Sequence, residues 1–120
     1  MTDERVGHTL AQMRDAAALA HSYVKGMTQE AFAADTRTQQ AVIMNLVIIG
    51  ELSTKLLKDH ADFVTRNPQI PWVSMKGMRN RIAHGYFEVN LEVVWITVKT
   101  ALPELQQQLM VALHSLQSKR

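Results

Sequence analysis

The sequence predicts an all-α fold, a bundle of four or five helices. Apolar residues recur at steps of three and four along most of the 120 residues, and no segment shows the alternation of a half-buried strand. Capping residues, glycine or proline separate the periodic segments. Hydrophobic residues make up 47% of the chain and charged residues 20%, which is typical of a globular protein. A chain of this length forms one core, so we expect residues 1–120 to be a single domain.

The first half of the chain predicts two long helices joined by a short one. The first long helix has an apolar face that consists of Val6, Leu10, Met13, Ala17, Ala20 and Val24. Thr28 is expected to cap a helix of one or two turns, and Asp35 to cap the second long helix. Apolar residues surround this second helix over residues 42–49, so we expect it to be the central helix. Gly50 is an isolated glycine inside this helix, and such a glycine often permits close approach of another helix.

The second half predicts a helix after the break at Asn67–Trp72, where two prolines favour extended backbone. This helix begins at Pro71 or Trp72 and runs through Ala83, and Gly85 is expected to end it in the left-handed conformation. Asn90 is expected to cap the last helix. Pro103 lacks a backbone donor, so it should kink or divide that helix.

Composition excludes several classes of function. Lysine and arginine number 13 against 11 acidic residues, a net charge of +2, so contact with phosphate requires a local cationic cluster. The absence of cysteine excludes disulfides, thiolate nucleophiles and metal sites that need sulfur. Four histidines share no spacing with acidic residues that suggests a metal site, and we expect no metal or cofactor: His8, His21, His60 and His114. The apolar stretch at residues 41–50 covers only about half a bilayer and the N-terminus lacks a signal-peptide pattern, so a cytoplasmic protein without a membrane partner is expected.

Candidate chemistry is concentrated between Lys76 and Tyr86. This segment holds three cations, a histidine, an amide and a phenol. Asn80 and His84 are four residues apart and share a helical face. Arg79 and His84 are five residues apart, which separates them by about 7.5 Å along the axis and roughly 140° around it. The long arginine side chain can still swing towards the histidine near the end of the helix, but spacing alone does not guarantee that the guanidinium and the imidazole converge.

These residue types suit cleavage of RNA by its own 2′-hydroxyl. Histidine exchanges protons near neutral pH, so His84 is the candidate general acid and base. Arg79 stays charged, so it can hold a phosphate and stabilise charge in the transition state. A basic cluster at a helix C-terminus also stabilises carbonyl groups without catalysis, and the spacing leaves that structural alternative open.

The motifs together resemble the HEPN superfamily (higher eukaryotes and prokaryotes nucleotide-binding). Within it, the chain is similar to the HepT-like toxins encoded beside minimal nucleotidyltransferases. Arg79, Asn80, His84 and Tyr86 match the family signature without a gap. The resemblance covers almost the whole chain and includes Ile48-Ile49-Gly50-Glu51-Leu52, Ile70-Pro71-Trp72, Met78 to Tyr86, Val94-Trp95 and Leu102-Pro103-Glu104-Leu105.

The resemblance implies an antiparallel four- to five-helix bundle of HEPN type that forms a two-fold homodimer. Arg79 and His84 of both subunits would line a cleft and cleave RNA as a metal-independent endoribonuclease, with Asn80 orienting the site or binding substrate. The protein would be the toxin of a type VII-like toxin–antitoxin pair. A cognate nucleotidyltransferase antitoxin would neutralise it by adenylylating Tyr86. The alternatives are a non-catalytic HEPN subunit that binds nucleotide or a nucleotidyltransferase, and a purely structural adaptor.

Several neighbouring residues have two interpretations. Lys76 and Arg81 are expected either to follow the RNA backbone or to form a solvated face. Glu51 is expected to pair with Lys55 four residues on, and a role near the cleft is the alternative. The two tryptophans are expected to anchor the core or an interface rather than to stack on bases: Trp72 and Trp95.

Overall fold

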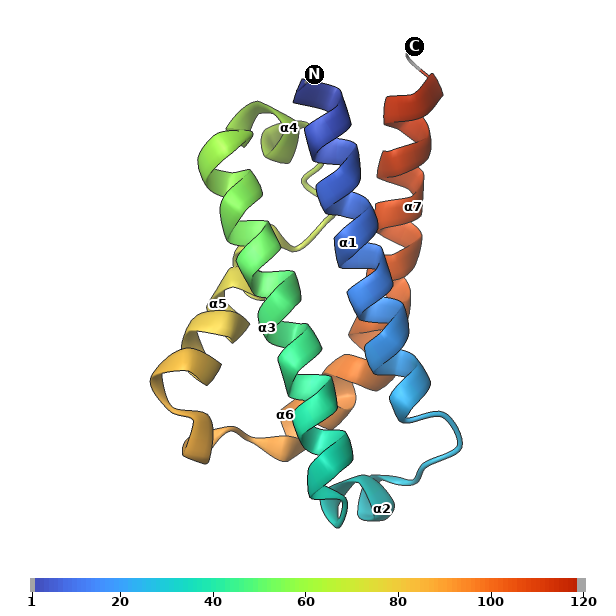
Figure 1. Ribbon diagram of the computed structural model, residues 1–120, viewed down its shortest axis with the longest axis vertical. Coiled ribbons are helices and arrows are strands. Elements are labelled where there is room, and N and C mark those ends of the chain that lie inside the picture. The colour runs from blue at the N-terminus through green and yellow to red at the C-terminus, as the bar shows by residue number, and fades with distance from the viewer. Residues whose placement is uncertain (1, 119–120) are drawn as a thin grey trace.

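The computed structural model describes residues 2–118, and all their regular structure is helical, which confirms the all-α prediction (Figure 1). The helices are α1 (Thr2–Tyr23), α2 (Gln29–Ala33), α3 (Thr36–Asp59), α4 (Ala61–Arg66), α5 (Trp72–His84), α6 (Leu91–Ile96) and α7 (Leu102–Ser118). A 3₁₀ turn η1 (Tyr86–Glu88) follows α5, and a π-helical turn η2 (Thr97–Ala101) joins α6 to α7. The long helices α1, α3, α5 and α7 form the bundle, with α3 antiparallel to α1 and α5, and α7 antiparallel to α1.

Helix α3 is the central helix, as expected. It packs against α1 on one side and α5 on another, and it also contacts α2, α4 and α6. Its buried residues are Val42, Ile43, Asn45, Leu46, Ile49, Gly50, Ser53 and Leu56. Among the helices of residues 2–118, α3 alone is long and apolar enough to cross a membrane by length and composition. However, 44% of its most apolar window is buried inside the bundle, which is typical of a core helix.

Side-chain caps fix the starts of three helices where the sequence predicts them. Thr28 accepts a hydrogen bond from the first turn of α2, Asp35 from that of α3, and Asn90 from that of α6. The backbone N–H and the hydroxyl of Thr38 both donate to Asp35 and hold the pKa of its carboxyl below the ordinary 3.8. Because the folded pKa is the lower one, this cap stabilises α3 above pH 3.8 and loses that effect as the pH falls through the folded pKa.

The predicted left-handed end of α5 at Gly85 is wrong. Gly85 has φ −153°, and among the described residues only Gly26, which follows α1, has a positive φ, of 77°. The chain has no need of a left-handed residue at the end of α5, because the helix passes directly into η1. The Gly85 N–H donates to the carbonyl of Arg81, and the Gly85 carbonyl accepts from Glu88.

The last helix is divided beside Pro103, in agreement with the prediction. Pro103 is the second residue of α7, and the π-helical turn η2 lies immediately before that helix. A proline removes one backbone donor and crowds the preceding turn, and the wider π turn accommodates both effects. The short helix α4 and the turn η1 are too short to give a periodic pattern and were not predicted from the sequence.

Gly50 brings α3 and α5 into close contact, as its position suggested. A Cβ atom on Gly50 would overlap the Cβ of Arg79 and lie 2.7 Å from the carbonyl oxygen of Met75. The Met75 oxygen is a backbone atom of α5 and the Arg79 Cβ is the first atom of its side chain, so neither atom can rotate away. Only glycine therefore allows this separation between the two helices.

We predict that Gly50→Ala destabilises the protein although alanine is the better helix former. Overpacking costs up to about 3 kcal/mol, and alanine returns roughly 1 kcal/mol of helix propensity, so the net loss should be about 2 kcal/mol. Gly77→Ala in α5 is the matched control, because its Cβ would meet only the flexible Nη1 end of Arg81, at 3.4 Å. It should raise the free energy of unfolding by up to roughly 1 kcal/mol in urea titrations. Equal effects of the two substitutions would contradict the close approach at Gly50.

Candidate functional site

Helix α5 carries the candidate residues and is anchored at its N-terminal end. The Trp72 side chain is buried, packs edge-on against Phe63 and donates from its indole nitrogen to the carbonyl of Asn67, 3.0 Å away. Trp95 is half-buried and packs against Phe32, with the ammonium group of Lys99 over its ring. Both tryptophans pack as anchors, and Trp72 fixes the direction in which α5 runs towards His84.

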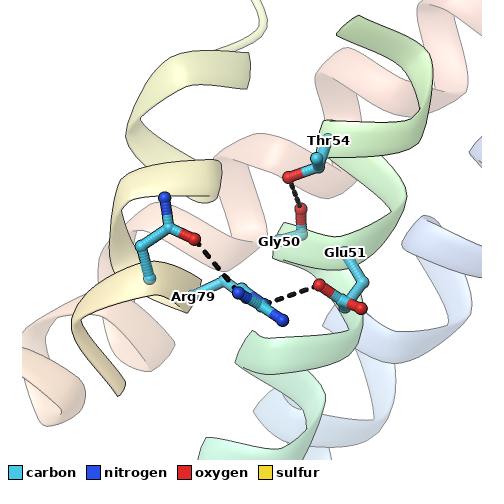
Figure 2. Close-up of polar contacts among 5 residues, drawn as sticks. Gly50, Glu51, Thr54 and Arg79 are labelled. Carbon is cyan, nitrogen blue, oxygen red and sulfur yellow. Dashed lines mark hydrogen bonds and ion pairs between the residues drawn. The ribbon is translucent and has the colours of Figure 1, made fainter. Parts of the chain in front are cut away.

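Arg79 is held by residues of two helices. Its Nε atom lies 2.6 Å from Oε1 of Glu51 on α3 (Figure 2). Its Nη1 donates to Oδ1 of Asn80 at 3.2 Å. The buried Nε–H is not aligned with any acceptor among the described residues, so the contact with Glu51 is an ion pair rather than a well-directed hydrogen bond. The expected pairing of Glu51 with Lys55 is wrong: Arg79 on the neighbouring helix takes its place.

The guanidinium keeps donors available for an anion. Of its five N–H groups, the one on Nε faces Glu51 and one on Nη1 is used by Asn80. No residue within 2–118 accepts a hydrogen bond from Nη2. The Arg79 side chain is 33% exposed, so part of it is open to solvent.

His84 lies at the other side of α5, at its last residue. It is exposed and lines an open cavity of about 430 Å³ between α5, η1 and α6. The lining residues are Met78, Arg81, Ile82, His84, Gly85, Glu88, Val89, Asn90, Val93 and Val94. Arg79 does not line this cavity, and no contact joins it to His84 among the described residues. One subunit therefore does not bring the guanidinium and the imidazole together.

Tyr86 begins the 3₁₀ turn η1, two residues after His84. Its side chain is 41% exposed, and its ring contacts that of Phe87 edge-on. Phe87 is 99% exposed and is not one of the residues predicted from the sequence. The signal that could have identified it is a large apolar residue in a short turn directly after a helix. Lys76 and Arg81 are also exposed on α5, and Asn80 is half-buried.

A larger cavity is remote from these residues. It has a volume of about 560 Å³ and lies between the start of α1 and the end of α7, at the opposite end of the bundle from η1 (Figure 1). His8 and His114 line it. Within the described part of the chain, no three histidine or acidic side chains are grouped closely enough to hold a metal ion. The candidate residues lie along α5 and in η1 instead.

Comparison with known proteins decides the family. Residues 13–112 match the family described as ribonuclease HepT-like. The chain belongs to this family. The match includes α3, α5 and η1, and it confirms the resemblance to HepT-like members of the HEPN superfamily.

Curated relatives carry ribonuclease names. A probable ribonuclease HepT from Thermococcus cleftensis is 38% identical over 97 residues, which are 81% of this chain and 86% of the relative. A putative RNase from Methanocaldococcus jannaschii is 37% identical over 81 residues, 68% of this chain and 64% of the relative. A putative RNase from Caldanaerobacter subterraneus subsp. tengcongensis is 36% identical over 85 residues, 71% and 73% of the two chains. No solved structure gives a significant match. The HepT-like family is thus a ribonuclease family, and RNA is the substrate class that its name implies.

Proposed function

We propose that this HepT-like protein is a metal-independent endoribonuclease that acts in the cytoplasm as a homodimer. The proposal rests on two groups of helix α5: the guanidinium of Arg79, which is restrained, and the imidazole of His84, which is exposed five residues later. The chain that carries them belongs to a ribonuclease family. The first group suits binding of a phosphate, and the second suits proton transfer. Together they supply what RNA cleavage by the adjacent 2′-hydroxyl requires.

The proposed reaction is an internal displacement at phosphorus. His84 accepts the proton of a 2′-hydroxyl, and the 2′-oxygen forms a bond to the adjacent phosphorus. The bond from phosphorus to the 5′-oxygen breaks, and that oxygen takes up a proton from protonated His84, leaving a 2′,3′-cyclic phosphate and a 5′-hydroxyl. Arg79 stabilises the charge that develops on the non-bridging oxygens. DNA lacks the 2′-hydroxyl and should not be cleaved.

A second subunit would complete the site. Within one subunit Arg79 faces α3 and His84 faces the cavity beside α6, so a two-fold dimer is the simplest way to place both groups on one phosphodiester. Exposed apolar side chains near this end of α5 support such an interface: Tyr86, Phe87, Val93 and Ile96. Lys76 and Arg81 would follow the RNA backbone and supply the local positive charge that the net charge of +2 does not.

Control by a cognate nucleotidyltransferase completes the proposal: the protein would be the toxin of a type VII-like toxin–antitoxin pair. The antitoxin would transfer AMP to the hydroxyl of Tyr86, which lies on an exposed turn two residues from His84. A nucleotide there adds negative charge and bulk beside the catalytic end of α5. It would therefore compete with the phosphate of RNA for Arg79.

We predict that His84→Ala lowers the rate of RNA cleavage by at least about 100-fold, because a general acid and base contributes that much or more. Wild-type protein should cleave single-stranded RNA in excess EDTA and leave cyclic phosphate ends. His114→Ala removes an exposed histidine of α7 and is the matched control, which should retain wild-type activity.

Two results would contradict this. Equal cleavage by the wild type and His84→Ala would assign the activity to a contaminant. No cleavage by the wild type, together with tight binding of the nucleotidyltransferase, would identify the protein as a non-catalytic subunit.

For modification, we predict that incubation with ATP and the neighbouring nucleotidyltransferase adds AMP to the wild type but not to Tyr86→Phe, as measured by intact mass. The chain offers a matched control, because its other tyrosine, Tyr23, is exposed to the same 41%. Tyr23→Phe should gain the same mass as the wild type. A mass gain by Tyr86→Phe would show that another residue accepts the nucleotide.

A further inference from the structure

Glu51 is the strongest candidate for a role outside the predicted motif. It lies on α3, directly after Gly50, and its carboxylate is the partner of the Arg79 Nε atom at 2.6 Å (Figure 2). The Glu51 side chain is 54% exposed, so the ion pair is at the surface rather than within the core. Ion pairs with a carboxylate this exposed contribute little to folding stability, and here the carboxylate also faces the buried Nε–H of Arg79.

The Arg79 side chain is restrained at three points. The contact of Gly50 with Arg79 Cβ fixes the base of the side chain against α3. Glu51 holds the Nε atom, and Asn80 accepts from Nη1, so the plane of the guanidinium cannot rotate freely. An arginine at the surface otherwise has many rotamers, and ordering it at the moment of binding lowers the rate.

We propose that Glu51 is a positioning residue for RNA cleavage: its carboxylate holds Arg79 by Nε so that the Nη2 edge meets the scissile phosphate. The inference rests on the proposed ribonuclease function. Glu51 does not contact RNA or transfer a proton in this account. It acts through the orientation of the Arg79 guanidinium.

This role predicts opposite effects on binding and on turnover. A carboxylate beside the phosphate site repels the RNA backbone, so removing its charge strengthens RNA binding. Removing it also frees the guanidinium to rotate, so fewer bound complexes have the reactive geometry. A residue that merely stabilised the fold would not separate these two quantities.

The test compares Glu51→Gln and Glu51→Asp with wild type in steady-state RNA cleavage. Glu51→Gln should lower kcat about tenfold or more and lower KM about twofold. Glu51→Asp keeps the charge but is one methylene shorter, so kcat should fall while KM stays unchanged. Glu104→Gln, which removes an exposed carboxylate of α7, is the control and should change neither constant. Wild-type kcat in Glu51→Gln would overturn the inference.

A second measurement does not depend on cleavage. The buried Nε–H of Arg79 should give a slowly exchanging NMR signal in the wild type, and Glu51→Gln should shift it and speed its exchange. An unchanged signal would overturn the positioning role. If the wild type fails to cleave RNA, the proposed function fails, and the NMR signal still decides whether Glu51 holds Arg79.

Discussion

The contact between α3 and α5 at Gly50 is the constraint on which the site depends. The two helices approach so closely that a single methyl group would collide with the backbone of Met75 and with Arg79. At this separation the carboxylate of Glu51, the next residue of α3, reaches Nε of Arg79. A wider spacing would leave the guanidinium free in solvent. The absence of a side chain at one buried position thus determines the orientation of a charged group at the surface.

The same geometry separates the two groups that the chemistry needs. Arg79 is turned towards α3, whereas His84 ends α5 beside the cavity formed with η1 and α6. Because α5 is a regular helix, residues five apart lie roughly 140° apart around its axis. The proposed active site is therefore shared between subunits, each of which presents a restrained arginine on one side of α5 and an exposed histidine on the other.

The sequence predicts best those features that depend on local interactions. The caps Thr28, Asp35 and Asn90 bond to their own first turns, and each is confirmed. The prediction of a left-handed Gly85 at the end of α5 is wrong, because the conformation of Gly85 is set by the turn η1 that follows it rather than by the helix that precedes it. The prediction that Glu51 pairs with Lys55 is wrong, because the packing of α5 against α3 brings Arg79 to Glu51. The catalytic assignment of Arg79 and His84 rests on the chemistry of the two side chains together with the family resemblance. It remains a prediction, since spacing alone also fits a structural basic cluster.

The most direct test of a shared site mixes two inactive variants. Arg79→Ala and His84→Ala subunits should each lack activity as homodimers, whereas a mixed dimer has one site with both an intact arginine and an intact histidine. If the two groups come from different subunits, unfolding and refolding the variants together should restore RNA cleavage to about a quarter of the wild-type level, since half the dimers are mixed and each has one of two sites. Mixed dimers that form but remain inactive would contradict the account and place both groups of each site in one subunit.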